Sequence, residues 1–307
     1  MSPCMKRAKE RQKKTMTLAE VYEYGTARLD EAGIEYPSVD AFYLLEYAAK
    51  IDKTKYLMFK DQEVAEKNFE QYKALIDRRA EHIPYQYITG TADFMGLVFE
   101  VNPDVLIPRL DTEVIGQEAL KVIGFEADVL DLCTGSGCIG ISLKRYRPDI
   151  HVTCTDISRR ALNVARKNIA HQHLELANET GNMQMGIRLL EGDLFEPLKD
   201  DEKFDLIVSN PPYVSESEYR DLMPEVKDHE PVIALIAGPE GLDIYKRLIA
   251  DAPAHLKEGG ILMLEIGSGQ AKAVTALMQE AGFKDIEVIK DLAELDRVVK
   301  GKICLTD

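Results

Sequence analysis

The first place in the sequence where chemistry is expected is a glycine-rich turn between an apolar stretch and a helix start. The stretch runs into Gly135, Gly137 and Gly140, which have the GxGxxG spacing. Asp156 follows 21 residues after the first of these glycines. Glycines let the backbone approach a ligand, a helix N-terminus favours negative charge, and a carboxylate at that distance binds two ribose hydroxyls. The turn therefore predicts a site for a nucleoside ligand.

Two further carboxylates favour S-adenosylmethionine over a dinucleotide. Asp131 stands at the mouth of the turn, where it would repel a pyrophosphate but suits the sulfonium and ammonium groups of S-adenosylmethionine. Asp193 closes the third predicted strand, where an acid can orient adenosine. Each carboxylate alone is also compatible with a polar strand end, but the two together favour S-adenosylmethionine over NAD.

The second candidate site is the loop Asn210, Pro211, Pro212 and Tyr213, directly after the predicted strand 204–209. Consecutive prolines stop a strand and stiffen the turn, and this turn lies outside the carboxyl end of the sheet, beside the predicted ligand. The Asn210 side-chain oxygen and the Pro211 carbonyl can each accept a hydrogen bond from an NH2 group. Tyr213 offers a flat face on which a planar acceptor can stack.

This loop suits methylation of a planar NH2 group. The lone pair of an amide or conjugated amine is delocalised, and two accepted hydrogen bonds draw electron density onto the nitrogen and hold its lone pair towards the methyl group. Reacting atoms held about 3–3.5 Å apart supply much of the acceleration. The proton leaves after transfer, so no general base is obligatory. The alternative is a rigid loop that happens to contain asparagine and tyrosine.

The elements that must position these residues alternate between strands and helices. The candidate strands are 127–132, 151–155, 187–190, 204–209, 260–266, 284–289 and 297–305. The alternation predicts an α/β fold with a doubly wound, mostly parallel, seven-stranded sheet of the class I methyltransferase type. The last two strands are expected to form an antiparallel hairpin, because the residues between them are too few for a crossover helix.

The segments before the sheet predict a smaller helical domain over residues 17–90. Thr17 and Glu20 have capping-box spacing, and further helices are expected from Ser38 and from about 64 to 80. Residues 91–110 are expected to form a β-hairpin linker with its turn at 102–104. Residues 111–307 form the expected methyltransferase domain, which opens with a helix from about 112 to 123.

Composition limits the partners. The net charge is −15, although residues 1–16 carry six basic side chains and one acidic one. We interpret these residues as a disordered basic tail rather than an RNA-binding arm, and expect no direct nucleic-acid partner. No stretch is apolar for long enough to span a membrane, and no secretory signal is expected. Five cysteines without a CxxC pair predict reduced thiols in the cytoplasm and no metal site.

From residue 17 onward the sequence resembles the release-factor glutamine methyltransferases, the PrmC/HemK family. The matching segments include 84–90, 107–113, 131–137 and the loop from Asn210 to Tyr213. The resemblance implies S-adenosylmethionine as cofactor and, as acceptor, the glutamine amide in the Gly-Gly-Gln loop of a peptide-chain release factor, held by residues 210–213. It also implies that the N-terminal helices help to dock the release factor. The cofactor contacts that it implies are Cys133, Thr134, Gly135, Ser136, Gly137, Asp156, Asp193, Leu194 and Asn210.

The sequence departs from the family pattern at two positions. Leu110 replaces a usual proline, which removes a stiffening ring, and Cys133 replaces a usual glycine, which calls for ordinary backbone angles there. Asp111 and Thr112 are interpreted as a polar linker and a helix N-cap, whereas Arg109 is a candidate either for interdomain contact or for closing over the ligand. Cys138 and Cys154 are interpreted as core residues.

Four alternatives stay open from the sequence. An adenine-N6 methyltransferase would use the same planar NH2 chemistry on nucleic acid, but the acidic composition does not support it. A sister activity on a glutamine of a ribosomal protein is closer. An NAD(P)-dependent oxidoreductase would leave Asp131 and the 210–213 loop without a role. A catalytically silent binding module would bind its partner without a cofactor. We expect a monomer.

Overall fold

The computed structural model describes residues 15–177 and 186–304, which divide into two compact units, residues 1–89 and 90–307. Most of the basic tail predicted for residues 1–16 lies outside the described residues. In the described part of the chain, no helix is long and apolar enough to cross a membrane.

The first unit is helical. Its helices are α1 (Leu18–Glu31), α2 (Pro37–Ala49), α3 (Lys53–Phe59), α4 (Glu66–Ala80) and α5 (Tyr85–Thr89). The capping box predicted at the start of α1 is present, because Thr17 and Glu20 bond to each other's backbone N–H groups. The short helices α3 and α5 were not predicted from the sequence; at one to two turns they carry little periodic signal.

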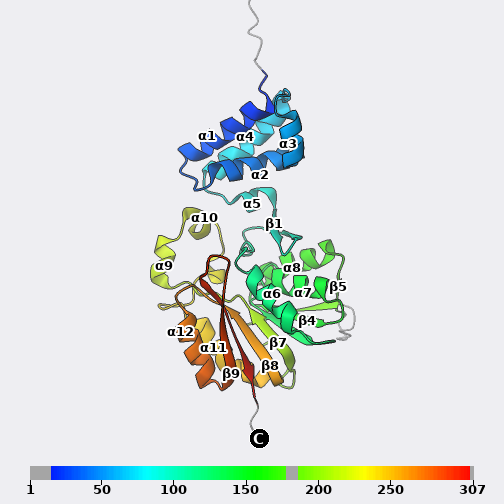
Figure 1. The fold of residues 1–307 in the computed structure, drawn as a ribbon, viewed down its shortest axis with the longest axis vertical. Coiled ribbons are helices and arrows are strands. Elements are labelled where there is room, and N and C mark those ends of the chain that lie inside the picture. The colour runs from blue at the N-terminus through cyan, green and yellow to red at the C-terminus, as the bar shows by residue number, and fades with distance from the viewer. Residues whose placement is uncertain (1–14, 178–185, 305–307) are drawn as a thin grey trace, which may run out of the picture. The chain divides into compact units, whose positions relative to one another are not determined.

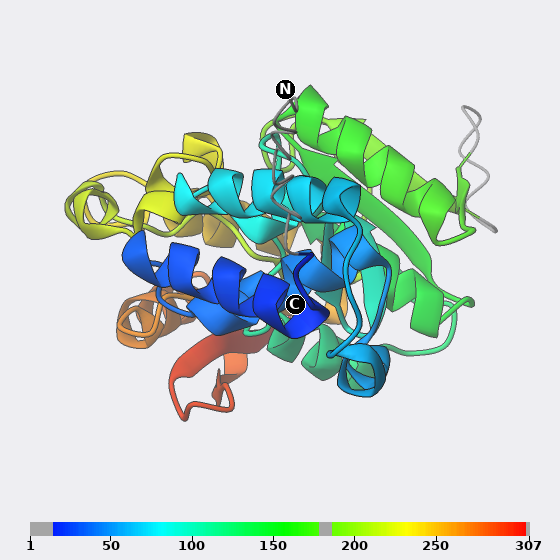
Figure 2. The same cartoon turned by 90° about the horizontal axis from the view of Figure 1, so that it is seen from above.

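The core of this unit lies between α1, α2 and α4, which meet through fully buried Leu29, Leu44, Tyr72 and Ile76. Figure 2 shows α1 in dark blue beside α4 in cyan. The Tyr72 hydroxyl, buried with these side chains, donates to the Ala41 carbonyl oxygen at 3.1 Å. The phenol is therefore satisfied inside the core, as a buried polar group must be.

A buried ion pair joins α2 to α4, and breaking it is expected to destabilise the unit. Arg79 Nε lies 2.6 Å from Asp40 Oδ2, and both side chains are at most 10% exposed. Asp40→Ala would remove the carboxylate that pairs with this buried guanidinium, so we expect a loss of about 3–5 kcal/mol in the free energy of unfolding. Hydrogen exchange of α4 amides in the full chain measures this loss.

The matched control is Asp77→Ala in the same unit. Asp77 pairs with Arg28 at 3.6 Å, but the two side chains are 48% and 42% exposed. An exposed pair contributes only about 0–1 kcal/mol, because water screens it. Equal losses in the two variants would contradict the assignment of the large effect to burial.

The second unit begins with a two-stranded hairpin, β1 (Thr91–Phe94) and β2 (Leu97–Glu100). Residues 102–104 do form the predicted turn, in which the Val105 N–H donates to the Asn102 carbonyl oxygen at 3.1 Å, but it is not the turn of the hairpin, because β1 and β2 pair before it. The chain reverses at Met95 and Gly96, whose φ angles of 49° and 73° are those of the tight turn that matches the twist of a hairpin. Residues 105–107 form no strand. The apolar run 94–101 concealed the turn because methionine is not a usual turn residue.

The large sheet has eight strands within the described residues. In spatial order they are β5 (Glu175–Leu176), β6 (Gly186–Glu191), β4 (His151–Asp156), β3 (Asp128–Leu132), β7 (Phe204–Ser209), β8 (Leu256–Glu265), β10 (Asp296–Ile303) and β9 (Phe283–Lys290). All seven predicted strands are present, and the two-residue β5 is added at one edge. The pairs from β5 to β8 are parallel, and β10 is antiparallel to both β8 and β9. The fold is therefore the predicted doubly wound sheet that ends in a hairpin.

Helices cover both faces of this sheet. The helices of the unit are α6 (Glu113–Val122), α7 (Cys138–Tyr146), α8 (Arg159–His171), α9 (Glu216–Asp221), α10 (Pro224–Lys227), η1 (Val232–Ala234), α11 (Asp243–His255) and α12 (Ala271–Glu280). Figure 1 shows α6, α7 and α8 on one side of the strands and α11 and α12 on the other. Val129 packs into the first layer and Leu130 into the second, so successive residues of β3 serve two separate cores.

The topology determines where a ligand can bind. From the central strand β3 the chain proceeds outward to β4 and β6, and then returns to β7 on the other side of β3. At such a reversal the loops that leave neighbouring strands diverge and open a crevice at the carboxyl edge of the sheet. The segments that follow β3, β4, β6 and β7 all lie at that edge.

Candidate functional site

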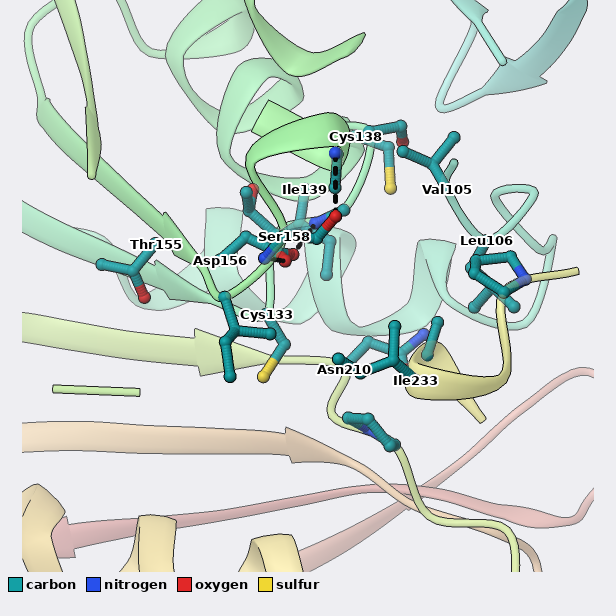
Figure 3. Close-up of a pocket in the computed structure, with 18 of the residues that line it drawn as sticks. Val105, Leu106, Cys133, Cys138, Ile139, Thr155, Asp156, Ser158, Asn210 and Ile233 are labelled. Carbon is teal, nitrogen blue, oxygen red and sulfur yellow. Dashed lines mark hydrogen bonds between the residues drawn. The ribbon is translucent and has the colours of Figure 1, made fainter. Parts of the chain in front are cut away.

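One cavity opens at this crevice, entirely within the second unit. Its wall includes residues at or just beyond the ends of four strands: Cys133 after β3, Asp156 at the end of β4, Asp193 after β6 and Asn210 after β7. Figure 3 shows Cys133, Asp156 and Asn210 around this space. Together with the open solvent at its mouth, the space between these walls has a volume of about 1120 Å³.

The glycine turn and Asp156 are joined by hydrogen bonds. Asp156 Oδ2 accepts from the Gly135 N–H, and Oδ1 accepts from the Ser158 N–H, both at 2.8 Å. Gly135 has a φ of 55°, and a Cβ built on it would meet nothing within 4 Å. Because Gly135 lines the cavity, its missing side chain leaves room for a ligand to reach the backbone. Burial raises the pKa of Asp156, and the two backbone N–H groups oppose that rise.

Gly140 serves packing rather than the ligand. A Cβ there would lie 2.7 Å from Cys154 Sγ, so α7 approaches β4 as closely as only glycine permits. Cys154 is fully buried in the core, as predicted. Cys138 is buried too, but it also lines the cavity, where burial raises the pKa of its thiol to about 12. That thiol is therefore neutral at neutral pH.

Asp131 is placed differently from our expectation, because it does not line the cavity. Its side chain is fully buried, and Oδ2 accepts from Thr134 Oγ1 at 2.6 Å and from the Gly140 N–H at 2.9 Å. The carboxyl thus lies behind the turn and ties its two ends together. Gly137 has a φ of 81° and does not line the cavity either. A Cβ built on Gly137 would lie 2.6 Å from Ile141 Cδ1.

The Asp131 carboxyl makes stability depend on pH. Burial raises its pKa to about 7, against the hydrogen bonds from Thr134 and Gly140. In the unfolded chain an aspartate has a pKa of about 3.9, so the folded chain binds the extra proton between these values. The contribution of Asp131 to the free energy of unfolding is therefore complete below pH of about 4 and is lost as the pH rises towards 7.

Asp131→Asn is expected to flatten this part of the stability profile, measured by urea unfolding of the full chain from pH 4 to 8. Asp251→Asn, on the exposed side of α11, is the matched control and should keep the wild-type slope. If the free energy of unfolding of Asp131→Asn depends on pH as steeply as that of the wild type, the Asp131 carboxyl is not the group that causes this dependence.

Cys133 corrects a second expectation. Its φ is 56°, so it adopts the left-handed conformation that the family's usual glycine would adopt, and not ordinary backbone angles. For a residue with a Cβ this conformation costs about 1–2 kcal/mol. The neighbouring hydrogen bond from the Thr134 N–H to the Thr155 carbonyl oxygen, at 3.0 Å, joins the turn to β4 and helps to hold that backbone.

The segment after β6 adds a charged pair to the wall. Asp193 Oδ2 accepts from Arg247 Nη2 at 2.7 Å, and both residues line the cavity. Leu194, buried and with a φ of 51°, lines it beside them. Arg247 was not predicted as a site residue. It belongs to α11, far from the motifs in the sequence, and nothing in the spacing of residues indicates that it reaches Asp193.

In the loop after β7, Asn210 and Pro212 line the cavity, whereas Pro211 and Tyr213 do not. Asn210 Nδ2 donates to Thr112 Oγ1 at 3.2 Å, so the amide nitrogen is engaged with the segment before α6. Pro211 is buried. The Tyr213 side chain packs on the second core, and burial raises the pKa of its hydroxyl to about 12.

The segment before α6 forms another part of the cavity wall. Ion pairs hold this segment on both sides of Leu110. Arg109 Nη2 lies 2.6 Å from Oε1 of the buried Glu230, and Asp111 pairs with Arg297 at 3.3 Å. Leu110 itself is 77% exposed. Arg109 lines the cavity. These pairs hold the segment where the family's usual proline ring is absent.

Of the residues expected to bind cofactor, eight line the cavity: Cys133, Thr134, Gly135, Ser136, Asp156, Asp193, Leu194 and Asn210. The expected cofactor residues Asp131 and Gly137 and the expected substrate residues Pro211 and Tyr213 lie outside the lining. The apolar part of the wall was not predicted from the sequence; it includes Val105, Leu106, Ile157 and Ile233. Ile157 had a usable signal, because the residue after an acid at the end of a parallel strand must lie at the same edge of the sheet.

The wall offers groups that a nucleoside ligand can use. The carboxylates of Asp156 and Asp193 can accept hydroxyl and amino hydrogens, the open face of Gly135 exposes backbone, and Ile157 and Ile233 offer apolar surface. Within residues 15–177 and 186–304, no group of three or more His, Cys, Asp or Glu side chains is arranged to hold a metal ion.

Comparison with known proteins gives two family matches. Residues 20–90 match the model described as "PrmC N-terminal domain", and residues 105–226 match "Methyltransferase small domain". The two matched regions fall in the two structural units.

Relatives similar along nearly the whole chain carry one name. A "Release factor glutamine methyltransferase" of Clostridium acetobutylicum is 41% identical over 88% of this chain and 93% of its own length. One of Geobacter sulfurreducens is 39% identical over 94% and 97%. Among solved structures, a methyltransferase from Pyrococcus furiosus aligns with a TM-score of 0.52 and 17% identity, over 75% of this chain and 99% of that one, which supports the fold alone.

Proposed function

The chain belongs to the release factor glutamine methyltransferases, and on that premise we propose that its cavity binds S-adenosylmethionine and presents a glutamine side chain at Asn210 for methylation. The acceptor is the amide nitrogen of the glutamine in the Gly-Gly-Gln loop of a peptide-chain release factor. The observation that carries the proposal is the position of Asn210, which lines the cavity and whose amide nitrogen donates a hydrogen bond to Thr112, so that its oxygen would accept from the acceptor amide.

The proposed cofactor contacts are the residues of the wall. Asp156 would accept the ribose hydroxyls, Asp193 would orient the adenosine, and the backbone of the turn at Gly135 would receive the carboxylate. S-adenosylmethionine supplies an electrophilic methyl carbon on a sulfonium sulfur. Asp131, fully buried behind the turn, would support the site through the backbone rather than by contact.

Asn210 acts on the acceptor amide. A carboxamide nitrogen is a weak nucleophile, because its lone pair is delocalised into the carbonyl group. When the Asn210 oxygen accepts one of its hydrogens, electron density moves to the nitrogen and the amide is held in one orientation. Acceptance of the second hydrogen by the Pro211 carbonyl stays a prediction, because Pro211 is outside the cavity lining. Fixing the reacting groups in this way lowers the barrier mainly through proximity. On transfer the nitrogen would gain the methyl carbon as the bond from that carbon to sulfur breaks, which leaves S-adenosylhomocysteine, and the nitrogen would then lose one proton to water. Stacking of the acceptor on Tyr213 stays a prediction.

Mass spectrometry of a release factor incubated with the protein and S-adenosylmethionine tests the proposal. We expect one added methyl group on the glutamine of its Gly-Gly-Gln loop. A Gly-Gly-Gln peptide and a matched Gly-Gly-Glu peptide show whether the amide is required. An adenine-containing oligonucleotide and a glutamine-containing ribosomal-protein peptide test the alternative acceptors. Methylation of either alternative without methylation of the release factor would overturn the proposal.

The proposed substrate also supports predictions about the cellular location of the protein and about the role of its first unit. A release factor acts on ribosomes, so we place the protein in the cytoplasm and expect the first unit, α1 to α5, to contribute to docking. The monomeric state predicted from the sequence stays a prediction, and sedimentation of the full chain tests it.

A further inference from the structure

We propose that Arg247 is a positioning residue that holds the Asp193 carboxylate where it accepts a hydrogen bond from the 6-amino group of adenine. The pair would thereby select an adenosine cofactor over its inosine counterpart. This inference rests on the proposed function, because it requires S-adenosylmethionine in the cavity. It deepens that proposal, since it names the chemical group of the cofactor that the segment after β6 recognises.

The order of the strands places the base of the ligand beside Asp193. Neighbouring strands lie in the order β6, β4, β3 and β7, and each is followed by a residue that lines the cavity, in the same order Asp193, Asp156, Gly135 and Asn210. In the proposed function the methyl group lies at Asn210 and the ribose at Asp156. A ligand that extends along this edge of the sheet therefore brings its base to the segment after β6.

Helix α11 supplies the part of the wall beside Asp193. Ile244 and Arg247 both line the cavity, and because they are three positions apart they lie on the same side of the helix. Arg247 Nη2 donates to Asp193 Oδ2 at 2.7 Å, which is the length of a charge-assisted hydrogen bond. The cavity is therefore bounded at this end by an ion pair that joins α11 to the segment after β6.

The Asp193 carboxylate can keep this contact and still bind a ligand. An ionised carboxylate has two oxygens and only accepts hydrogen bonds. Oδ2 accepts from Arg247, whereas no hydrogen bond from residues 15–177 or 186–304 reaches Oδ1. The Asp193 side chain is 30% exposed and lines the cavity, so solvent and ligands can reach it. In the proposed complex, Oδ1 accepts from the cofactor.

The choice between adenine and hypoxanthine follows from the chemistry of a carboxylate. Adenine carries an NH2 group at position 6, which donates, whereas hypoxanthine carries an oxygen there, which only accepts. A carboxylate can bond to the first but meets the lone pairs of the second, and a polar group left unpaired in a site rejects such an analogue. Arg247 restrains the carboxylate in the position that makes this choice. Water screens the pair where it is exposed, and a bound base would displace that water and strengthen it.

Calorimetric titration of the full chain with S-adenosylhomocysteine and with S-inosylhomocysteine tests the inference. We expect the wild type to bind S-adenosylhomocysteine about 10- to 100-fold more tightly, which is the factor that a hydrogen bond to a charged group contributes. Arg247→Met should raise the Kd for S-adenosylhomocysteine by about 3- to 10-fold, because the carboxylate is no longer held. The Kd for S-inosylhomocysteine should change little, so the ratio of the two Kd values falls.

This ratio is a readout that a purely structural role would not move, since general damage to the site weakens both ligands alike. Arg247→Lys keeps the positive charge and should recover part of the ratio. Asp193→Asn offers an NH2 group as well as an oxygen and should bring the ratio close to one. The matched control is Lys246→Met, which removes the same charge from the next position of α11. Lys246 pairs with Asp243 at 3.3 Å and does not line the cavity, so this variant should keep the wild-type ratio.

The possible failures are distinguishable. If the wild type binds neither S-adenosylmethionine nor S-adenosylhomocysteine, the proposed function fails. If it binds S-adenosylhomocysteine but does not discriminate against S-inosylhomocysteine, or if Arg247→Met or Asp193→Asn keeps the wild-type ratio, the inference fails alone. An equal fall of the ratio in Lys246→Met would also overturn it. If Arg247→Met does not fold, Arg247→Gln removes the same charge, and a wild-type ratio in that variant contradicts the inference.

Discussion

Asn210→Ala is expected to abolish most methyl transfer without abolishing cofactor binding. Asn210 lines the cavity, and its amide oxygen is the group that we propose to polarise the acceptor. Removing one positioned hydrogen-bonding group of this kind typically lowers kcat by roughly 10²–10³-fold. The Kd for S-adenosylhomocysteine should rise far less than kcat falls, because Asn210 is one of several wall residues proposed to contact the cofactor, whereas its amide oxygen acts directly on the acceptor. Single-turnover transfer to a Gly-Gly-Gln peptide and calorimetric titration measure the two effects.

The matched control is Asn163→Ala. Asn163 is exposed on α8, where its side-chain oxygen accepts from Arg166, and it does not line the cavity. It should keep the wild-type kcat and Kd. Unchanged turnover in Asn210→Ala would remove the mechanism proposed for the loop, even if the protein still methylated release factors.

Asp156→Ala is expected to lower the affinity for the cofactor, whereas Asn210→Ala is expected to lower kcat. The carboxylate would accept ribose hydroxyls while it also receives the N–H groups of Gly135 and Ser158. Hydrogen bonds to a charged group contribute about 1.5–3 kcal/mol each, so the loss of two corresponds to an increase in Kd for S-adenosylhomocysteine of about 100-fold or more. At saturating S-adenosylmethionine, kcat should recover in part, which distinguishes this variant from Asn210→Ala.

Glu191→Ala provides the comparison for Asp156. Glu191 is directly opposite Asp156 in the pairing of β4 with β6, but it is outside the cavity and pairs with Arg159 at 2.6 Å. Both are acids at the ends of neighbouring parallel strands, so the two variants differ chiefly in whether the carboxylate faces the cavity. Equal and small effects of both substitutions on Kd would contradict the assignment of Asp156 to the ribose.

Repeating patterns in the sequence determined the architecture. Strands buried on both faces read as short apolar runs, and their alternation with helices allows few topologies, so the doubly wound sheet and its closing hairpin were predictable. The carboxyl ends of neighbouring parallel strands must share an edge. The approach of Cys133, Asp156, Asp193 and Asn210 to one cavity therefore also followed from the sequence.

Predictions from motifs, spacing and hydrophobicity were wrong where they could not show which way the backbone or a side chain turns. The turn at Met95 and Gly96 was missed because hydrophobicity continued through it. Asp131 was expected at the ligand, but its carboxyl turns inward to the Thr134 hydroxyl and the Gly140 N–H. Spacing places a residue at an edge of the sheet; it does not decide to which side the side chain turns.

The partners of the site residues were decided by the tertiary structure. Asp193 meets Arg247 from α11, and Asn210 meets Thr112 from a segment almost one hundred positions earlier in the chain. Such contacts depend on how helices and loops pack over the sheet, and no periodicity or motif encodes that packing. The sequence thus determined the sheet, its reactive edge and the residue types found there. The folded chain decided which of those side chains face the cavity and which atom of Asn210 is hydrogen-bonded to Thr112.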